Sequence, residues 1–515
     1  MRKFQINSLF LSAPYPGTLK FKGQPTGLLY ALSVLANRKS LELGEKKLKQ
    51  HMVVWGPDTV LDFDKSNFKK ELSNYLKTKK PQFVGISTFT ISYKNSINIF
   101  KFIKKILPKT IVIFGGSHED NFVKYYRKKN KIDVDFVVSG DGMFILDWLY
   151  SLIENNWPIS LDELKNKILK QKDELGKLPG TGLLLFNHKN KLINLFTQTN
   201  ILDSIYRKPI RLDQIPIMPR YLLKDEKEVS SCFDIFNNKK TAQMMIGQGC
   251  PFSCGFCSEG IKKVWYDLDS PRSLNFIRSL NHVKKELKIL KKEKYKAIFF
   301  DDSTFLAKPK NYVFDLIKLV GKYGFIWGCQ TTQSSIHTFA DLMTFFKENG
   351  CEYIYIGLEH FDKEMRDSFG KQIGSGNKFL NYNFEDTLTI IKKARINLAV
   401  SLTFGHPDPL SNNEKTRENK NTVKFAIDKT SDLIKKFPNI IGVSLNIITY
   451  HPGTKITQRY EEKMGDIGFT DLPNNEKPFT IFEEGMGPHA PGMSKQLANY
   501  ILRYAKKKFG DKLWI

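Results

Sequence analysis

Three cysteines that lie within eight residues constrain this chain more than any other feature of its sequence. The segment GQGCPFSCGFCSEG spaces Cys250, Cys254 and Cys257 as Cys-x3-Cys-x2-Cys, directly after an apolar stretch typical of a strand. A loop at that point can fold its sulfurs around a metal, and thiolates are the ligands that iron–sulfur clusters use. A cube of four irons has four positions to fill, so three cysteines leave one iron open. The sequence therefore predicts a 4Fe–4S cluster whose fourth iron is available to another ligand.

A zinc site or a disulfide framework would fit these cysteines less well. A structural zinc site needs four ligands, usually as two close pairs. Cys232 has no neighbouring Cys or His, and the next histidine downstream, His282, falls in a helix-like segment. A secreted disulfide framework would spread its cysteines more evenly. We expect Cys329 and Cys351 to pack in a core as small apolar side chains, and we expect one cluster in a reducing, cytoplasmic compartment.

The size and composition of the chain indicate a folded protein of two domains. Its 515 residues exceed what one hydrophobic core supports. No apolar run approaches the roughly 20 residues that cross a bilayer, and the first residues are too polar for a signal peptide. The net charge of +27 raises the question of nucleic-acid binding. However, the basic residues are mostly lysines spread along the chain, whereas phosphate and base recognition favours clustered arginines, so a solvated lysine-rich surface fits the charge better.

Residues 1–155 alternate short apolar runs with helix-like segments, which predicts a parallel, doubly wound α/β sheet of the Rossmann type. The strand candidates are Asn7–Ala13, His51–Trp55, Phe83–Ser87, Ile111–Phe114 and Phe136–Ser139. Glycines follow two of these strands, at Gly115-Gly116 and at Gly140. Turns of this kind bring backbone close to a ligand at the carboxyl edge of a sheet.

A second alternation follows a stretch of different character. Residues 156–240 contain two hairpin-like apolar segments and a proline-rich passage, which we interpret as a connector. Residues 241–460 then carry six strand candidates, each followed by a helical stretch: Gln243–Gln248, Ala297–Phe300, Gly324–Thr331, Tyr353–Leu358, Leu398–Thr403 and Gly442–Thr449. This pattern predicts an open (β/α)6 barrel with its site at the carboxyl ends of the strands. Residues 461–515 form a C-terminal extension to which the pattern assigns no role.

The cysteine loop, with Phe256 just before the third cysteine, resembles that of the radical S-adenosylmethionine (SAM) superfamily. The segment IFFDDSTF resembles the second-strand segment that contacts the SAM amino group, which implies this role for Asp302, with Asp301 as the reserve candidate. The segment YIGLEH is similar to the fourth-strand Gly-x-Glu segment, which implies that Gly357 and Glu359 lie near the SAM ribose. The segments FGHPDP and HPGT resemble the turns that follow the fifth and sixth strands.

The N-terminal region is similar to the cobalamin-binding domain of one large class of this superfamily. It carries GISTFT, IFGGSH and DFVVSGDG in the same order, and the connector carries the similar stretch LDQIPIMPR. The resemblance implies that the glycines Gly115, Gly116 and Gly140 cradle a corrin, with the hydroxyls of Ser87 and Thr88 nearby.

The chain departs from these patterns at a few positions. It lacks the Asp-x-His-x-x-Gly motif that gives some cobalamin proteins an axial histidine, and neither His51 nor His118 has that setting. The resemblance therefore implies a cobalt without a protein histidine below it. Gln248 and Gln333 stand where relatives often carry arginine, which affects expected contacts to SAM but not to the cluster.

The resemblances imply an enzyme that cleaves SAM to a 5′-deoxyadenosyl radical and, with cobalamin, methylates an unactivated carbon of a small molecule or peptide. A first alternative is a cobalamin-independent radical SAM isomerase, cyclase or oxidase. A second, of another class, is a basic nucleic-acid-binding protein with a structural metal. Either enzyme would need an external electron donor such as flavodoxin or ferredoxin.

Overall fold

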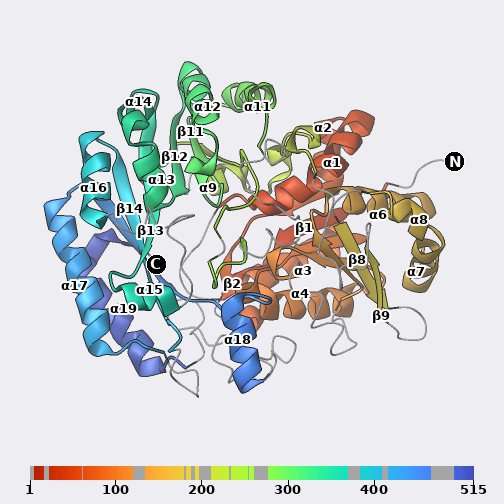
Figure 1. Ribbon diagram of the computed structural model, residues 1–515. Coiled ribbons are helices and arrows are strands. Elements are labelled where there is room, and N and C mark those ends of the chain that lie inside the picture. The colour runs from red at the N-terminus through yellow and green to blue at the C-terminus, as the bar shows by residue number, and fades with distance from the viewer. Residues whose placement is uncertain are drawn as a thin grey trace. The chain divides into compact units, whose positions relative to one another are not determined.

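The computed structural model divides the chain into two compact units, each built around its own sheet (Figure 1). The first unit comprises residues 1–229 with 264–267, and the second comprises residues 230–263 with 268–515. The structure describes residues 5–16, 23–60, 62–119, 134–178, 181–186, 192–196, 210–230, 234–252, 254–259, 277–368, 383–408, 416–465 and 492–514. Cys232 and residues 466–491 of the predicted C-terminal extension lie outside these ranges.

The first sheet is parallel over five strands and contains all five strands that the sequence predicts. Its order is β3-β1-β5-β6-β7-β8-β9, in which the last two strands are antiparallel. The bounds are β3 Met52–Trp55, β1 Ser8–Ser12, β5 Phe83–Ser87, β6 Ile111–Gly115, β7 Phe136–Gly140, β8 Thr181–Phe186 and β9 Leu192–Phe196. From β1 the chain first forms β3 on one side and later forms β5 on the other side of β1. This reversal of strand order creates a switch point between β1 and β5, and open α/β sheets bind ligands at such points.

Helices cover this sheet because its central strands are apolar on both faces. Every residue of β1 is buried, as expected for a parallel strand that is covered from two sides. Helix α1 (Thr26–Leu43) packs against α6 (Met143–Asn156), and α3 (Asn67–Lys79) contacts α4 (Tyr93–Ile106). Where α1 meets α6, the ammonium of Lys39 and the carboxylate of Glu154 form a buried ion pair at 2.7 Å.

Part of the stretch interpreted as a connector is instead part of the first sheet. Strands β8 and β9 form the hairpin that the apolar segments suggested, and β8 pairs with the edge of β7 in the register Val137↔Leu184. Pairing satisfies the backbone groups that β7 would otherwise expose as an edge strand. The first unit thus extends beyond residue 155. The described passage at residues 210–230 contains no strand of either sheet.

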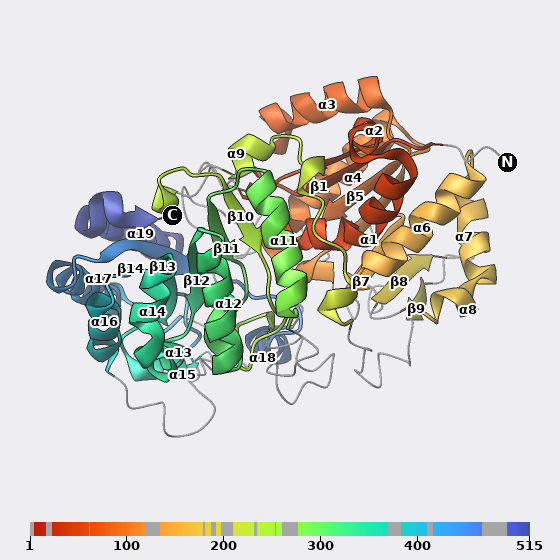
Figure 2. The same cartoon turned by 90° about the horizontal axis from the view of Figure 1, so that it is seen from above.

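The second sheet is entirely parallel and contains all six predicted strands plus one more. Its order is β10-β11-β12-β13-β14-β15-β16. The bounds are β10 Thr241–Met244, β11 Ala297–Phe300, β12 Ile326–Thr331, β13 Cys351–Glu359, β14 Asn397–Phe404, β15 Ile440–Ile447 and β16 Leu513–Trp514. Helices α11 (Leu280–Lys292) and α12 (Lys310–Lys322) lie along one side of this sheet (Figure 2).

The inner face of the second sheet is apolar near the amino ends of its strands. Ala297, Tyr353 and Ala399 pack there with Phe236, and the ring of Trp514 joins them. β15 carries a glycine, Gly442, beneath that ring, where a Cβ atom would lie 2.2 Å from it. The predicted C-terminal extension thus supplies the strand β16, which packs against this apolar end, while polar side chains gather at the carboxyl ends.

No helix among the described residues is long and apolar enough to span a bilayer.

Candidate active site

The cysteine loop follows the carboxyl end of β10, and its three thiols are near enough to one another for their charges to interact. Burial, followed by the charge of the neighbouring Cys254, raises the pKa of Cys250 above its ordinary value. Burial, together with Glu259 and the other two thiols, raises the pKa of Cys257 to about 12. The loop is folded by a turn in which the Cys257 N–H donates to the Cys254 carbonyl at 3.1 Å.

This donor set fits a 4Fe–4S cluster. Metal binding must displace protons from these thiols, since thiolates are the ligating form. Among the described residues, no three His, Cys, Asp or Glu side chains are grouped as the ligands of a single metal ion are. In a 4Fe–4S cube each cysteine ligates a different iron, so its thiolates need not meet at one point.

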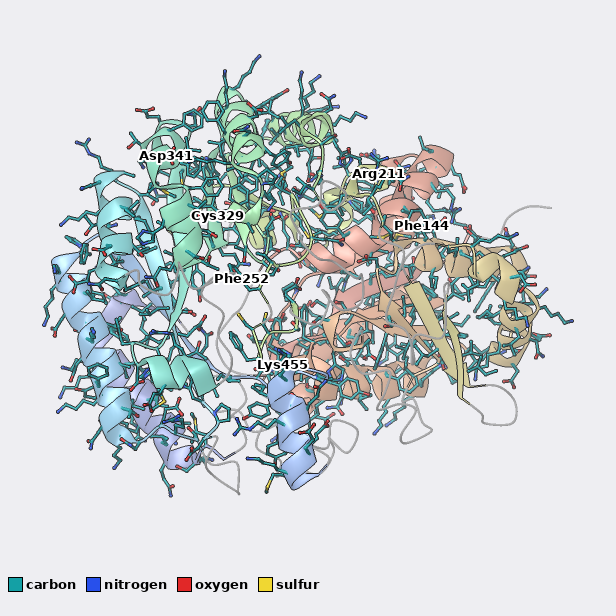
Figure 3. The ribbon with its side chains drawn as sticks, viewed as in Figure 1. Phe144, Arg211, Phe252, Cys329, Asp341 and Lys455 are labelled. Carbon is teal, nitrogen blue, oxygen red and sulfur yellow. The ribbon has the colours of Figure 1, made fainter. Side chains whose placement is uncertain are left out.

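Apolar side chains and a helix hold the loop in place. Phe252, labelled in Figure 3, belongs to the loop and is buried. The Gly255 carbonyl accepts a hydrogen bond at 3.2 Å from the N–H of Ile456, in the first turn of α18 (Lys455–Met464). Cys329 and Cys351 are buried in the core of the second sheet, which confirms their expected packing role.

The structure separates the two neighbouring aspartates that follow β11. Both oxygens of Asp302 are engaged by the start of the cysteine loop: Oδ1 accepts from Gly247 N–H at 2.6 Å and Oδ2 from Ile246 N–H at 3.1 Å. The ammonium of Lys308 lies 2.7 Å from Oδ1, and both side chains are buried. Asp302 therefore holds the protein's own backbone, which explains why β10 ends at Met244 rather than at the predicted Gln248.

Asp301, the reserve candidate, faces the other way. Successive residues of a strand point to opposite faces, and Asp301 continues the alternation of Phe299, whose ring packs on Tyr353 at 6.4 Å inside the barrel. Asp301 is partly exposed, and the amide of Gln243 lies 3.5 Å from its Oδ2. Of the two acids, Asp301 is thus the one presented to the inside of the barrel at its polar end.

Glu359 occupies a strained turn at the end of β13. Its φ is +64°, which is uncommon for a residue other than glycine, and the N–H of His360 donates to the carbonyl of Leu358 at 2.9 Å across it. Such three-residue turns are rare, and backbone strain of this kind concentrates at functional sites. The carboxylate accepts hydrogen bonds from the hydroxyls of Ser401, at 3.4 Å, and Thr403 on β14. Gly357, two residues earlier, pairs with Ser401 in the sheet.

A buried carboxylate that no motif singled out fixes the turn after β14. Glu418 accepts from the backbone N–H groups of Gly405 at 2.9 Å and His406 at 3.0 Å, and the His406 ring and the Thr416 hydroxyl also contact it. His406 holds the pKa of Glu418 below its ordinary value although burial opposes this. His360 packs against His406, and burial first, then His406, lowers the pKa of His360 to about 4. The Gly-x-Pro motif indicated a turn here whose backbone N–H groups need an acceptor, but it did not indicate which residue accepts from them.

At the carboxyl edge of the first sheet, the predicted residues divide into those that pack internally and those that do not. Thr88 is fully buried, and its hydroxyl contacts the Gly115 carbonyl and a Glu119 carboxylate oxygen, each at 3.0 Å. Gly116 has a φ of +109°, and a Cβ there would lie 2.6 Å from the Thr88 carbonyl oxygen. The turn itself therefore requires Gly116 and uses the Thr88 hydroxyl.

Ser87 and Gly115 are available at the same edge. Ser87 pairs with Ser12 across the switch point between β1 and β5 and is partly exposed. A Cβ at Gly115 would meet only the Val138 carbonyl, at an ordinary 3.6 Å. Gly140, at the end of β7, has a φ of +89°. Ser87 at the switch point, and Gly115 and Gly140 at the ends of the next two strands, fit a ligand that approaches the backbone along this edge of the sheet.

The two histidines between residues 1 and 155 lie at different ends of the first sheet, and each is engaged by the protein itself. His51 precedes β3, at the amino edge, and its Nδ1 lies 3.0 Å from the Asn7 amide oxygen. His118 is buried, with its ring packed on Tyr93 at 4.3 Å and its Nδ1 at 3.2 Å from the Thr90 hydroxyl.

Two family models match the chain, one in each unit. Residues 244–418 match the Radical SAM superfamily, and residues 44–146 match the B12 binding domain. The chain is thus a cobalamin-dependent radical SAM enzyme: a B12-binding domain followed by a radical SAM domain. The predicted recognition and fold class are confirmed, and the cofactors of the two domains are those predicted, namely a 4Fe–4S cluster, SAM and cobalamin. The radical SAM match accounts for the cysteine loop, so the loop gives no support to the alternative of a structural metal in a nucleic-acid-binding protein.

Individual relatives are distant. An uncharacterized methyltransferase, PH0819, from Pyrococcus horikoshii is 24% identical over 440 residues, which are 84% of this chain and 78% of that protein. The anaerobic magnesium-protoporphyrin IX monomethyl ester cyclase of Rubrivivax gelatinosus is 23% identical over 289 residues, 55% of this chain and 45% of the cyclase. The radical SAM methyltransferase TsrM from Kitasatospora setae, solved with cobalamin and a [4Fe-4S] cluster bound, shares the fold: the TM-score is 0.57 at 15% identity, over 99% of this chain and 93% of that one.

The buried pair at the cysteine loop gives a stability prediction. Replacing Asp302 by alanine should lower the free energy of unfolding by about 3–5 kcal/mol, because the Lys308 ammonium and two N–H groups lose their acceptor in a buried place. Urea unfolding followed by tryptophan fluorescence measures this. The control is Asp341→Ala, which removes an exposed pair with Lys310 and should cost at most about 1 kcal/mol. Equal effects of the two substitutions would show that Asp302 does not hold the start of the cysteine loop.

Proposed function

We propose that this chain is a cobalamin-dependent methyltransferase that acts on an unactivated carbon. The observation that carries the proposal is the conjunction of a three-thiol loop after β10 with a separate ligand edge on a B12-type sheet. When bound, the cluster supplies the electron that cleaves SAM to a 5′-deoxyadenosyl radical, and cobalamin supplies the methyl group.

The chain's own residues bind and orient these groups. Cys250, Cys254 and Cys257 hold the cluster, and Phe256 directly precedes the third thiolate in the loop. Asp301 accepts hydrogen bonds from the SAM ammonium, in place of Asp302, whose carboxylate is committed to the loop. Glu359 accepts from the ribose hydroxyls beside the backbone of Gly357. These side chains are assigned from their positions at the carboxyl ends of β10, β11 and β13.

Cobalamin occupies the carboxyl edge of the first sheet. The hydroxyl of Ser87 and the partly exposed residues Gly115 and Gly140 face the ligand, while Thr88 and Gly116 form the turn itself. Among the described residues of this unit, His51 lies at the opposite edge and His118 is buried against Tyr93, so neither would serve as a ligand of the cobalt. An external one-electron donor, such as a flavodoxin or ferredoxin, completes the system.

A second candidate is a cyclase or other radical rearrangement. The local similarity to the Rubrivivax gelatinosus cyclase favours it, whereas the longer match to PH0819 favours methyl transfer. The two differ in what SAM becomes, because a methyl donor is converted to S-adenosylhomocysteine as well as to 5′-deoxyadenosine.

The cluster is tested by its iron. Anaerobically reconstituted protein should hold about four irons and absorb at about 400 nm, as Cys-ligated clusters do. Cys254→Ala should lose most of the iron and all SAM cleavage. A colorimetric assay measures the iron, and the amount of 5′-deoxyadenosine formed measures the cleavage. Cys351→Ala, which removes a buried thiol outside the loop, should keep both. Stoichiometric zinc without iron in the wild-type protein would refute the cluster.

SAM binding separates the two aspartates. Asp301→Ala and Glu359→Gln should each weaken SAM binding by about 1.5–3 kcal/mol, roughly ten- to hundred-fold in Kd, because each removes a charged hydrogen-bond partner. Calorimetry on iron-loaded protein measures this. Asp341→Ala serves as the matched control. Unchanged affinity in both variants would show that neither acid contacts SAM.

Cobalamin retention is tested at Gly115, where the fold leaves room. Gly115→Ala should keep the iron and most of the cobalamin, whereas Gly115→Leu should keep the iron and lose the cobalamin, measured by absorbance after desalting. Loss of cobalamin should abolish S-adenosylhomocysteine formation and spare reductive SAM cleavage.

If cobalamin binds with its own benzimidazole base held away from the cobalt, and neither His51 nor His118 replaces that base, the cob(II)alamin EPR spectrum of the wild-type protein should lack nitrogen superhyperfine splitting. Formation of 5′-deoxyadenosine without any S-adenosylhomocysteine in the cobalamin-loaded protein would favour the cyclase candidate instead.

A further inference from the structure

The segment that follows β11 reaches the cysteine loop at two points. Asp302 holds the backbone at the start of the loop through both of its carboxylate oxygens. Two residues later, the hydroxyl of Thr304 lies 3.4 Å from the Sγ of Cys250, although the two residues are 54 positions apart in the sequence. Thr304 is only 3% exposed. A buried hydroxyl is thus placed against one of the three cluster-binding sulfurs.

The position of Thr304 is fixed from both sides. Before it, Asp302 is held by the Lys308 ammonium and two backbone N–H groups. After it, the ring of Phe305 stacks on Phe300 with centroids 4.5 Å apart and lies 5.7 Å from Trp327. Because residues held in this way impose their geometry on their neighbours, the contact with Cys250 is set by the fold rather than by the freedom of a surface side chain.

The hydroxyl proton has two possible acceptors. With Cys250 as a thiol, the Thr304 hydroxyl donates to the Ser303 carbonyl at 2.8 Å. When Cys250 is a metal-bound thiolate it carries no proton, so it can only accept from this hydroxyl. Hydrogen bonds to charged acceptors are about twice as strong as neutral ones. Ser303 is exposed, so water can replace the hydroxyl at its carbonyl.

We infer that Thr304 is a positioning residue that donates a hydrogen bond to the Cys250 sulfur and thereby raises the reduction potential of the cluster. Reduction adds one electron to the cluster and neither forms nor breaks a bond to the protein. The added negative charge strengthens an O–H···S hydrogen bond, so this contact stabilises the reduced state more than the oxidised one. The inference rests on the proposed cluster.

The test is an EPR-monitored titration of the iron-loaded full chain with dithionite, in the absence of SAM. Thr304→Val keeps the shape of the side chain and removes the hydroxyl. At a fixed solution potential near the midpoint, its ratio of reduced to oxidised cluster should fall about tenfold, which is about 59 mV for a one-electron couple. Thr304→Ser, which keeps the hydroxyl, should behave as the wild type.

Thr430→Val is the matched control. It removes an equally buried hydroxyl that bonds the Ala426 carbonyl on α17 (Lys420–Lys436), and it should leave the potential unchanged. A Thr304→Val protein with full iron and an unshifted potential would overturn the inference, as would loss of iron from this variant, which would assign the hydroxyl to holding the loop. Failure of the wild-type chain to take up iron would instead refute the cluster itself.

Discussion

The geometry of the candidate active site depends on one buried carboxylate. Asp302 draws the backbone N–H groups of Ile246 and Gly247 away from the sheet and ends β10 there. The chain that leaves the strand is thereby aimed into the loop that carries the three thiols. A carboxylate in so dry a place needs a counter-charge, and Lys308 provides it from the same segment. The direction of the cysteine loop, and hence the position of any cluster, follows from this ion pair.

The sequence was sufficient to predict the two sheets, because parallel strands buried on both faces appear as apolar runs between helical segments. It was also sufficient for the cysteine loop, whose chemistry requires that residue type at that spacing. It was less reliable for strand ends and for the stretch after residue 155. There, β8 and β9 join the first sheet because β7 offers an edge, a property of the assembled sheet rather than of the hairpin's own residues. β16 was not predicted for the same reason. Its two residues form a strand only because they pair with β15 in the assembled sheet.

The residues that line the sites were harder to predict than the folds that carry them. A carboxylate at the end of a strand can bind a ligand or close the strand's own backbone, and the motif is the same in both cases. Asp301 and Asp302 are adjacent, and only the alternation of β11 in three dimensions distinguishes them. Glu359 could be named from its motif, but the left-handed turn that sets it apart is a backbone property. Glu418 could not be named, since it lies thirteen and twelve residues beyond the two N–H groups, of Gly405 and His406, that it accepts from.

The same ambiguity governs the glycines of the first sheet, and sterics resolve it. Both Gly115 and Gly116 stand where a corrin would approach, and either could be taken for a ligand-facing residue. A side chain at Gly116 would strike the backbone of Thr88, so the turn demands glycine there whether or not a ligand is present. The protein leaves room for a side chain at Gly115, so its own packing does not require glycine there. The absence of a side chain at this position therefore points to a bound ligand. In an α/β fold the edge that binds ligands is also the edge where the chain turns. A residue there points to a ligand only when the fold itself leaves that residue unexplained.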